Sequence, residues 1–108
     1  MIKQVTDNTY ENELKNITKD KIILDFYADW CGPCKVVSEI LNSLDNQNND
    51  HESNFMIMKI DVDASPELTT SYNVEALPTL VFLNKDREII GKEIGLVKEE
   101  IIKTYLND

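Results

Sequence analysis

Two apolar segments, Lys21–Ala28 and Phe55–Val62, constrain the fold of this chain more than any other feature of its sequence. The first carries the unbroken run Ile22-Ile23-Leu24, and the second carries the run Met-Ile-Met-Lys-Ile. Apolar runs of this length are typical of strands that are buried on both faces of a sheet. Both faces of such a sheet must be covered by helices, so the two segments predict an α/β protein.

Four helices are expected around these strands, because apolar residues recur at helical spacing or a capping residue precedes them. They are a helix from Asn8 to about Asn16, a helix carrying Val36, Val37, Ile40, Leu41 and Leu44, a short helix opened by Ser65-Pro66-Glu67, and a last helix with Val97, Ile101, Ile102 and Tyr105 on one face. The expected caps are Asn8 with Glu11 for the first helix and Ser65 for the third. The last helix should also carry an ion pair between Glu99 and Lys103.

A β-hairpin is expected in the second half of the chain. Thr79–Leu83 and Glu88–Ile94 are strand-like, and the segment Asn84-Lys85-Asp86-Arg87 separates them as a turn. A further short strand is expected near Ile2–Thr6. Together these segments predict a central mixed β-sheet of about four to five strands flanked by about four helices, in one domain that spans residues 1–108.

The charge of the chain limits its function classes. With 11 Lys and Arg against 20 Asp and Glu, the net charge is −9. This charge disfavours nucleic acids and anionic membranes as partners, because both require a basic surface. No apolar run approaches the ~20 residues of a membrane span, and Met1–Asn16 holds no apolar core of a secretory signal. A cytoplasmic location is therefore expected, where a cysteine pair tends to be catalytic.

Both cysteines lie in the hexapeptide Trp30-Cys31-Gly32-Pro33-Cys34-Lys35. Two thiols separated by two residues can form a small disulfide and reopen it without moving the fold. The chain-entropy model gives so short a loop only about 2 kcal/mol of stabilisation, so the pair is a weak structural link. The alternatives are a metal site and two unrelated core thiols. A zinc site needs four Cys or His ligands, and the remaining candidate, His51, lies in the polar stretch Asn42–Asn54, which is expected to be a helix end and an exposed loop. Redox chemistry is the favoured interpretation.

These segments together resemble the thioredoxin family. The stretch Asp25–Lys35 reads Asp-Phe-Tyr-Ala-Asp-Trp-Cys-Gly-Pro-Cys-Lys and is similar to the active-site segment of that family. The other signatures of the family follow in the expected order: Lys59-Ile60-Asp61-Val62-Asp63, Tyr72-Asn73-Val74, Leu77-Pro78-Thr79 and Gly95. The resemblance covers nearly the whole chain. It implies a thioredoxin fold and a thiol–disulfide oxidoreductase that reduces disulfides in proteins.

Two local departures from the family pattern carry structural expectations. Glu39 stands where many bacterial members have a proline that kinks the helix, so an unbroken helix is expected here. The glycine that is usual in the last hairpin turn is missing. Asn84 or Asp86 is expected to adopt the left-handed conformation in its place.

The resemblance implies unequal roles for the two cysteines. Cys31 is expected at the start of a helix, where unpaired N–H groups and the macrodipole stabilise a thiolate, and it would be the exposed nucleophile that attacks a substrate disulfide. Cys34, one turn into the helix, would be the shielded thiol that resolves the mixed disulfide. Gly32 and Pro33 would set the reduction potential. Pro33, in place of the histidine of disulfide isomerases, favours a reductant.

The resemblance further implies a proton-transfer pair, Asp25 and Lys59. Asp25 lies inside the apolar run Ile-Ile-Leu-Asp-Phe-Tyr, where desolvation should raise its pKa. It matches the aspartate that accepts the proton of the resolving thiol in the family, and Lys59 matches the lysine that pairs with this aspartate. Otherwise, Asp25 is a satisfied structural carboxylate or points to solvent at a strand edge.

The segment Leu77-Pro78-Thr79 matches the cis-proline loop of the family, which faces the disulfide. An ordinary trans proline in a turn is the alternative. The bent backbone at Leu77 would offer its N–H and C=O to an extended substrate segment. The resemblance also implies an uncharged docking face for partner proteins, made of Trp30, Gly32, Pro33, Val62, Leu77, Pro78, Ile94, Gly95 and Leu96.

The partners implied by the resemblance are disulfide-containing substrate proteins and a thioredoxin reductase that draws electrons from NADPH. The chain itself would need no metal or bound cofactor and would act as a monomer. Two other functions stay open: a thioredoxin-fold binding module whose thiols are incidental, and an oxidant or isomerase. Intact Cys31, Cys34, Asp25 and Pro78 argue against the binding module, which would need none of them.

Overall fold

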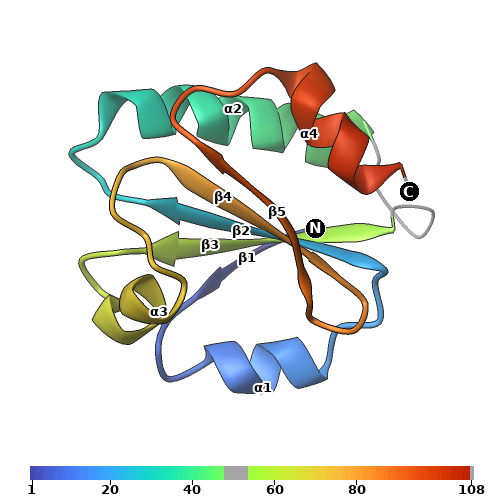
Figure 1. Ribbon diagram of the computed structural model, residues 1–108, viewed down its shortest axis with the longest axis horizontal. Helices are drawn as coiled ribbons and strands as arrows, with labels where there is room; N and C mark the ends of the chain where they lie inside the picture. Colours follow the sequence, from blue (N-terminus) through green and yellow to red (C-terminus); the bar gives the residue numbers. More distant parts are fainter. Residues whose placement is uncertain (48–53, 108) are drawn as a thin grey trace.

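The strand β2 (Lys21–Tyr27) lies at the centre of a five-stranded sheet with the order β1-β3-β2-β4-β5 (Figure 1). In this computed structural model, which describes residues 1–47 and 54–107, the first three strands of that order are parallel, β4 is antiparallel to β2, and β5 is antiparallel to β4. The remaining strands are β1 (Ile2–Val5), β3 (Phe55–Asp61), β4 (Thr79–Asn84) and β5 (Ile89–Ile94). The expected mixed sheet is confirmed, and the short N-terminal strand forms one of its edges.

Helices cover both faces of the sheet (Figure 1). One layer holds α2 (Gly32–Gln47) and α4 (Glu99–Leu106), and the other holds α1 (Tyr10–Lys15) and α3 (Pro66–Ser71). Each layer closes its own apolar core. Because side chains alternate along a strand, Ile22 and Leu24 of β2 enter the core with α1 and α3, whereas Ile23 packs against α2 and α4. Asp25, two residues after Ile23, is therefore on the face that α2 covers.

The helix α2 runs unbroken through Glu39, as the missing proline predicted. Its buried side chains are Cys34, Val37, Leu41 and Leu44. Val36 was expected on the same face, but its side chain is 48% exposed. Likewise Ile101 of α4 is 42% exposed, whereas Ile102 is fully buried. In both helices, one of two adjacent apolar residues lies outside the arc that contacts the sheet.

The expected Asn8–Glu11 cap of the first helix is wrong. Thr9 is the N-cap of α1, and its side chain makes no capping hydrogen bond to the helix. The hydroxyl of Thr9 instead accepts a hydrogen bond from the backbone N–H of Thr6 at 2.9 Å, which closes the turn before the helix.

The helix α3 begins at Pro66 after Ser65, as expected, but the serine side chain does not cap it. Asp7, which precedes α1, supplies the cap. Its carboxylate accepts hydrogen bonds from the N–H groups of Glu67 and Leu68 at 3.1 and 2.9 Å. A negative charge at this end of a helix is favourable, because the first N–H groups are unpaired.

The hairpin between β4 and β5 is confirmed, but its left-handed residue is Arg87, with φ 68°, rather than Asn84 or Asp86. The side chain of Asn84 explains the difference. Its Oδ1 accepts hydrogen bonds from the N–H groups of Asp86 and Glu88 at 2.9 and 3.0 Å, so it organises the turn from the last position of β4.

Two further expectations concern the chain ends and the polar stretch. The ion pair of Lys103 with Glu99 is confirmed at 3.1 Å. His51 and part of the Asn- and Asp-rich stretch lie outside the described residues.

Among the described segments, no helix combines the length and apolar character needed to cross a membrane.

Candidate active site

The two cysteines form a disulfide at the junction of β2 and α2, with their Cα atoms 5.3 Å apart. Cys31 directly precedes the first residue of α2, and its N–H donates to the carbonyl of Ala28 at 3.2 Å. The N–H of Cys34, in the first turn of the helix, points at the sulfur of Cys31, with 3.2 Å between N and Sγ. The sulfur of Cys31 therefore lies at the positive end of the helix dipole.

Neither cysteine is exposed in the disulfide form. Cys31 is 5% exposed and Cys34 is 3% exposed, so the expectation of an exposed Cys31 is wrong for this form. Ala28, Val62 and Leu77 pack against the pair and exclude solvent. The two residues nevertheless open onto different surfaces: Cys31 lines a groove of about 570 Å³, and Cys34 lines a separate pocket of about 150 Å³.

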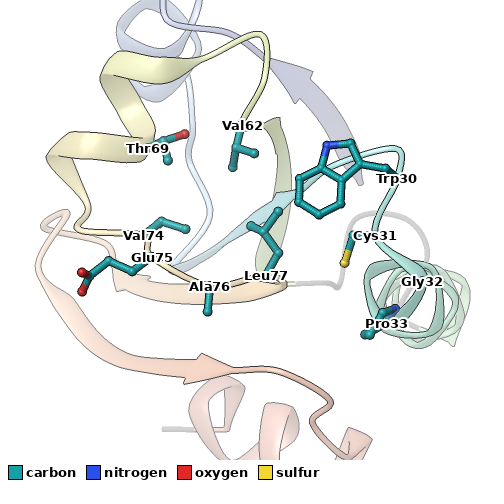
Figure 2. Close-up of a pocket in the computed structure, with 10 residues that line it drawn as sticks. All are labelled: Trp30, Cys31, Gly32, Pro33, Val62, Thr69, Val74, Glu75, Ala76 and Leu77. Carbon is teal, nitrogen blue, oxygen red and sulfur yellow. The ribbon is translucent and has the colours of Figure 1, made fainter.

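The groove beside Cys31 is mostly apolar (Figure 2). In Figure 2, Val62 and Leu77 point toward each other beside Trp30, whose indole lies above the sulfur of Cys31. Trp30 is 71% exposed, and its Nε1–H donates to the carboxylate of Asp63 at 2.9 Å. The lining residues are Trp30, Cys31, Gly32, Pro33, Val62, Thr69, Val74, Glu75, Ala76 and Leu77.

The peptide bond between Leu77 and Pro78 is cis, so the trans alternative is excluded. Pro78 is buried, and its carbonyl accepts a hydrogen bond from the N–H of Gly95 at 2.8 Å. Gly95 has φ +85°, a conformation that glycine adopts without strain. This bond ties the end of β5 to the proline loop, with Ile94 and Leu96 exposed on either side.

Only part of the expected docking face lines this groove. Trp30, Gly32, Pro33, Val62 and Leu77 line the groove together, whereas Pro78, Ile94, Gly95 and Leu96 do not line it. Sequence reasoning missed four lining residues: Thr69, Val74, Glu75 and Ala76. Three of them directly precede the proline loop, and that adjacency was the available signal. Thr69 carried none, because α3 brings it there from outside the motifs. With Glu75 on it, the face is not uncharged.

Asp25 is fully buried, with 0% exposure, and neither of its carboxylate oxygens has a hydrogen-bond partner among the described residues. Burial raises the pKa of Asp25 from 3.8 to about 6, and the nearby ammonium group of Lys59 limits the rise. The alternative that Asp25 points to solvent at a strand edge is therefore excluded. The group is an acid that can take up a proton near neutral pH.

Lys59 lies beside Asp25 because the two residues are register partners on the parallel strands β3 and β2. Its Nζ is 3.9 Å from the Asp25 carboxylate, which is an ion pair without a hydrogen bond. The ammonium group donates to the hydroxyl of Ser38 on α2 at 2.9 Å and lies 4.5 Å from the ring centre of Tyr27. Ser38, which sequence reasoning did not single out, thus holds Lys59 toward the helix.

The residues of the site converge at one end of the strands of the sheet. The strands β2 and β3 end there, β4 begins there after Pro78, and β5 ends there before Gly95 (Figure 1). Within residues 1–47 and 54–107, no group of three or more Cys, His, Asp or Glu side chains could hold a metal ion.

Comparisons with known proteins match the whole chain. The family model for thioredoxin matches residues 1–108. A thioredoxin from Listeria monocytogenes is 34% identical over 107 residues, which are 99% of this chain and 97% of that protein. A solved mutant thioredoxin from Halobacterium salinarum NRC-1 superposes with a TM-score of 0.82 at 30% identity, over 97% of this chain and 87% of the other. Oxidised mitochondrial thioredoxin 3 from Saccharomyces cerevisiae superposes with a TM-score of 0.79 at 35% identity, over 99% of this chain and 94% of that protein.

Proposed function

The chain belongs to the thioredoxin family, whose members are thiol–disulfide oxidoreductases, and from this premise we propose that it acts as a reductant of protein disulfides. One observation carries the proposal: the Cys31–Cys34 disulfide stands at the start of α2, with Cys31 at the wall of an apolar groove. A groove of this kind fits an extended segment of another protein and brings its disulfide to Cys31.

In the first step, the thiolate of Cys31 attacks one sulfur of a substrate disulfide. A mixed disulfide forms, and the other substrate sulfur leaves as a thiolate that takes up a proton. The N–H of Cys34 and the dipole of α2 favour the thiolate of Cys31. The backbone of Leu77, turned by the cis bond to Pro78, would hold the substrate segment by short strand addition.

In the second step, Cys34 loses its proton and attacks the sulfur of Cys31, which releases the reduced substrate. The substrate gains two electrons and two protons, and the chain ends with the disulfide seen here. Asp25 is the proposed proton acceptor, because it is buried on the sheet face that α2, the helix of Cys34, covers and its pKa of about 6 lets it take up a proton near neutral pH. Lys59 is its proposed partner.

Pro33 gives the proposed direction of electron flow. A proline between the cysteines adds no cation that would stabilise the thiolate, so the pair donates electrons more readily than a pair with histidine at this place. A thioredoxin reductase that uses NADPH would return the electrons, in a cytoplasmic redox system. The proposed unit is a monomer with one domain over residues 1–108.

A reduction assay with insulin tests the proposal. With dithiothreitol as the electron source, the chain should accelerate precipitation of the insulin B chain, and a variant with both Cys31→Ser and Cys34→Ser should not. Activity with a thioredoxin reductase and NADPH should follow. If both electron sources fail with the intact cysteines, the binding-module function takes precedence. A reduction potential well above that of the glutathione pool would favour the oxidant.

A further inference from the structure

The groove beside Cys31 has one charged residue among the ten described residues that line it, Glu75. Figure 2 shows its carboxylate pointing outward on the side away from Trp30, with Val62 and Leu77 drawn between the two residues. A second negative charge borders the opposite end, where Asp63 accepts the hydrogen bond of the Trp30 indole. The apolar floor of the groove thus lies between two carboxylates and no lining cation.

The charge of Glu75 is not neutralised within the described part of the chain. Glu75 is exposed, and within that part it forms no hydrogen bond or ion pair. Lys92 is the cation held near this segment, but its ammonium group donates to the backbone carbonyls of Tyr72 and Asn73, at 3.3 and 3.1 Å. A carboxylate left free at the edge of a groove is available to a bound partner.

We propose that Glu75 selects substrate segments that carry Lys or Arg close to the disulfide. The inference rests on the proposed function, since it names the substrate class of the same groove. An apolar side chain of the segment would lie against Val62 and Leu77, and a basic side chain at its end would pair with Glu75. The net charge of −9 adds a field of the same sign, which speeds the approach of basic segments.

The position of the basic residue follows from chain geometry. Leu77 packs against Cys31, and Glu75 is two residues away from Leu77, which spans at most about 7 Å of extended chain. A substrate segment that follows this wall would reach Glu75 about two residues from its reacting cysteine. A Lys or Arg side chain at that position has the length to form the ion pair.

The test uses two peptide disulfide dimers that differ only in a Lys or a Glu two residues from the cysteine, made in versions with this residue on either side. Their kcat/KM values are measured with dithiothreitol as the electron source. A charge near the sulfur also changes the intrinsic reactivity of each peptide disulfide. The readout is therefore the ratio of kcat/KM for the Lys peptide to kcat/KM for the Glu peptide, compared between the parent chain and each variant. In one of the two versions, Glu75→Gln should lower this ratio at least about threefold, and Glu75→Lys should lower it further. Salt at about 0.5 M should shrink the differences.

Asp20→Lys is the matched control. Asp20 is exposed at the start of β2, and the Cys motif follows the other end of that seven-residue strand, roughly 20 Å away, beyond the Debye length of about 8 Å. Asp20→Lys makes the same charge change as Glu75→Lys and should leave the Lys-to-Glu ratio unaltered. An equal response to both changes, or no response in Glu75→Gln, would overturn the proposal. A neutral disulfide, bis(2-hydroxyethyl) disulfide, checks the reductase activity separately: if the parent chain does not reduce it, the proposed function fails instead.

Discussion

Burial outweighs the ion pair at Asp25. The ammonium of Lys59 is 3.9 Å from the carboxylate, too far for a hydrogen bond, and it donates a hydrogen bond to the hydroxyl of Ser38 instead. Within the described part of the chain, both carboxylate oxygens lack a hydrogen-bond partner, and desolvation by burial raises the pKa to about 6. A buried acid that costs stability, beneath the helix that carries Cys34, fits the proposed role in proton transfer.

Asp25→Asn should make the protein more stable at neutral pH. The folded pKa of about 6 exceeds the ordinary value of 3.8, so the folded state binds more protons than the unfolded state between these values. Stability is therefore lost as pH rises through this window, and the full loss is present above it. At about 1.4 kcal/mol per pKa unit, the variant should gain roughly 3 kcal/mol at pH 7, less the cost of a buried amide. Urea unfolding at several pH values measures it.

The gain should vanish at about pH 4, where the carboxyl is protonated in the folded state. A gain of equal size at both pH values would show that packing rather than charge is responsible. The same variant should exchange disulfides more slowly, and a rate profile unchanged between about pH 6 and 9 would remove Asp25 from the mechanism.

The two cysteines should differ in a trapping experiment. Cys34→Ser leaves a nucleophile without a resolving thiol, so the mixed disulfide with an oxidised substrate should accumulate. Cys31→Ser should accumulate little, because the remaining thiol does not line the groove. Non-reducing electrophoresis after incubation with oxidised insulin distinguishes them. Adducts in Cys31→Ser alone would reverse the proposed roles.

At the scale of elements, the six-residue helix α3 depends on a residue from outside itself. Its N-terminal N–H groups bind the carboxylate of Asp7, whereas the hydroxyl of its own N-cap, Ser65, is buried without a hydrogen-bond partner among the described residues. The helix also carries Thr69, which lines the groove. The turn before α1 therefore helps to hold one wall of the site.

Asp7→Ala should destabilise the fold by about 1 kcal/mol, with a range of roughly 0.5–2 for the loss of a helix cap. Asp7→Asn is the control, because it keeps an oxygen acceptor while it loses the charge, and it should retain part of the stability. Thermal unfolding measures both. Equal stability of Asp7→Ala and the parent chain would show that the cap does not hold α3.

In the last hairpin, the hydrogen bonds of one side chain decide which residue adopts the left-handed conformation. Asn84 was a reasonable candidate for the left-handed position by residue type, because Asn tolerates it well. Instead its amide oxygen binds two N–H groups of the turn, which fixes Asn84 outside that position, and Arg87 takes the positive φ. Residue preference alone could not decide between these arrangements.

At the scale of the whole molecule, charge opposes compaction. The net charge is −9, and like charges held together in a folded chain repel one another. Raising NaCl from about 10 to 150 mM shortens the Debye length from about 30 to 8 Å. The Tm at pH 7 should therefore rise by about 3 °C, equivalent to roughly half a kcal/mol.

Acidic pH supplies the control for this prediction. At the sequence pI of about 4.5 the net charge is near zero, so the same salt series should leave the Tm almost unchanged. Scanning calorimetry at both pH values gives the comparison. An equal rise at both would mean that salt acts through burial of apolar surface rather than through screening.

The order and type of the strands and helices, and the redox cysteine pair, could be predicted from the residues alone. These features are encoded locally: apolar runs mark the buried strands, helical spacing marks α2, and both thiols lie within one turn. The cis-proline loop was implied by the family resemblance instead. Which distant residues meet became known from the folded chain. Asp7 caps a helix 60 residues away, and Ser38 binds Lys59 across 21 residues. The groove likewise gathers Trp30, Thr69 and Glu75 from separate loops and helices. Such contacts depend on how elements pack across the sheet, and no local pattern of residues specifies that packing.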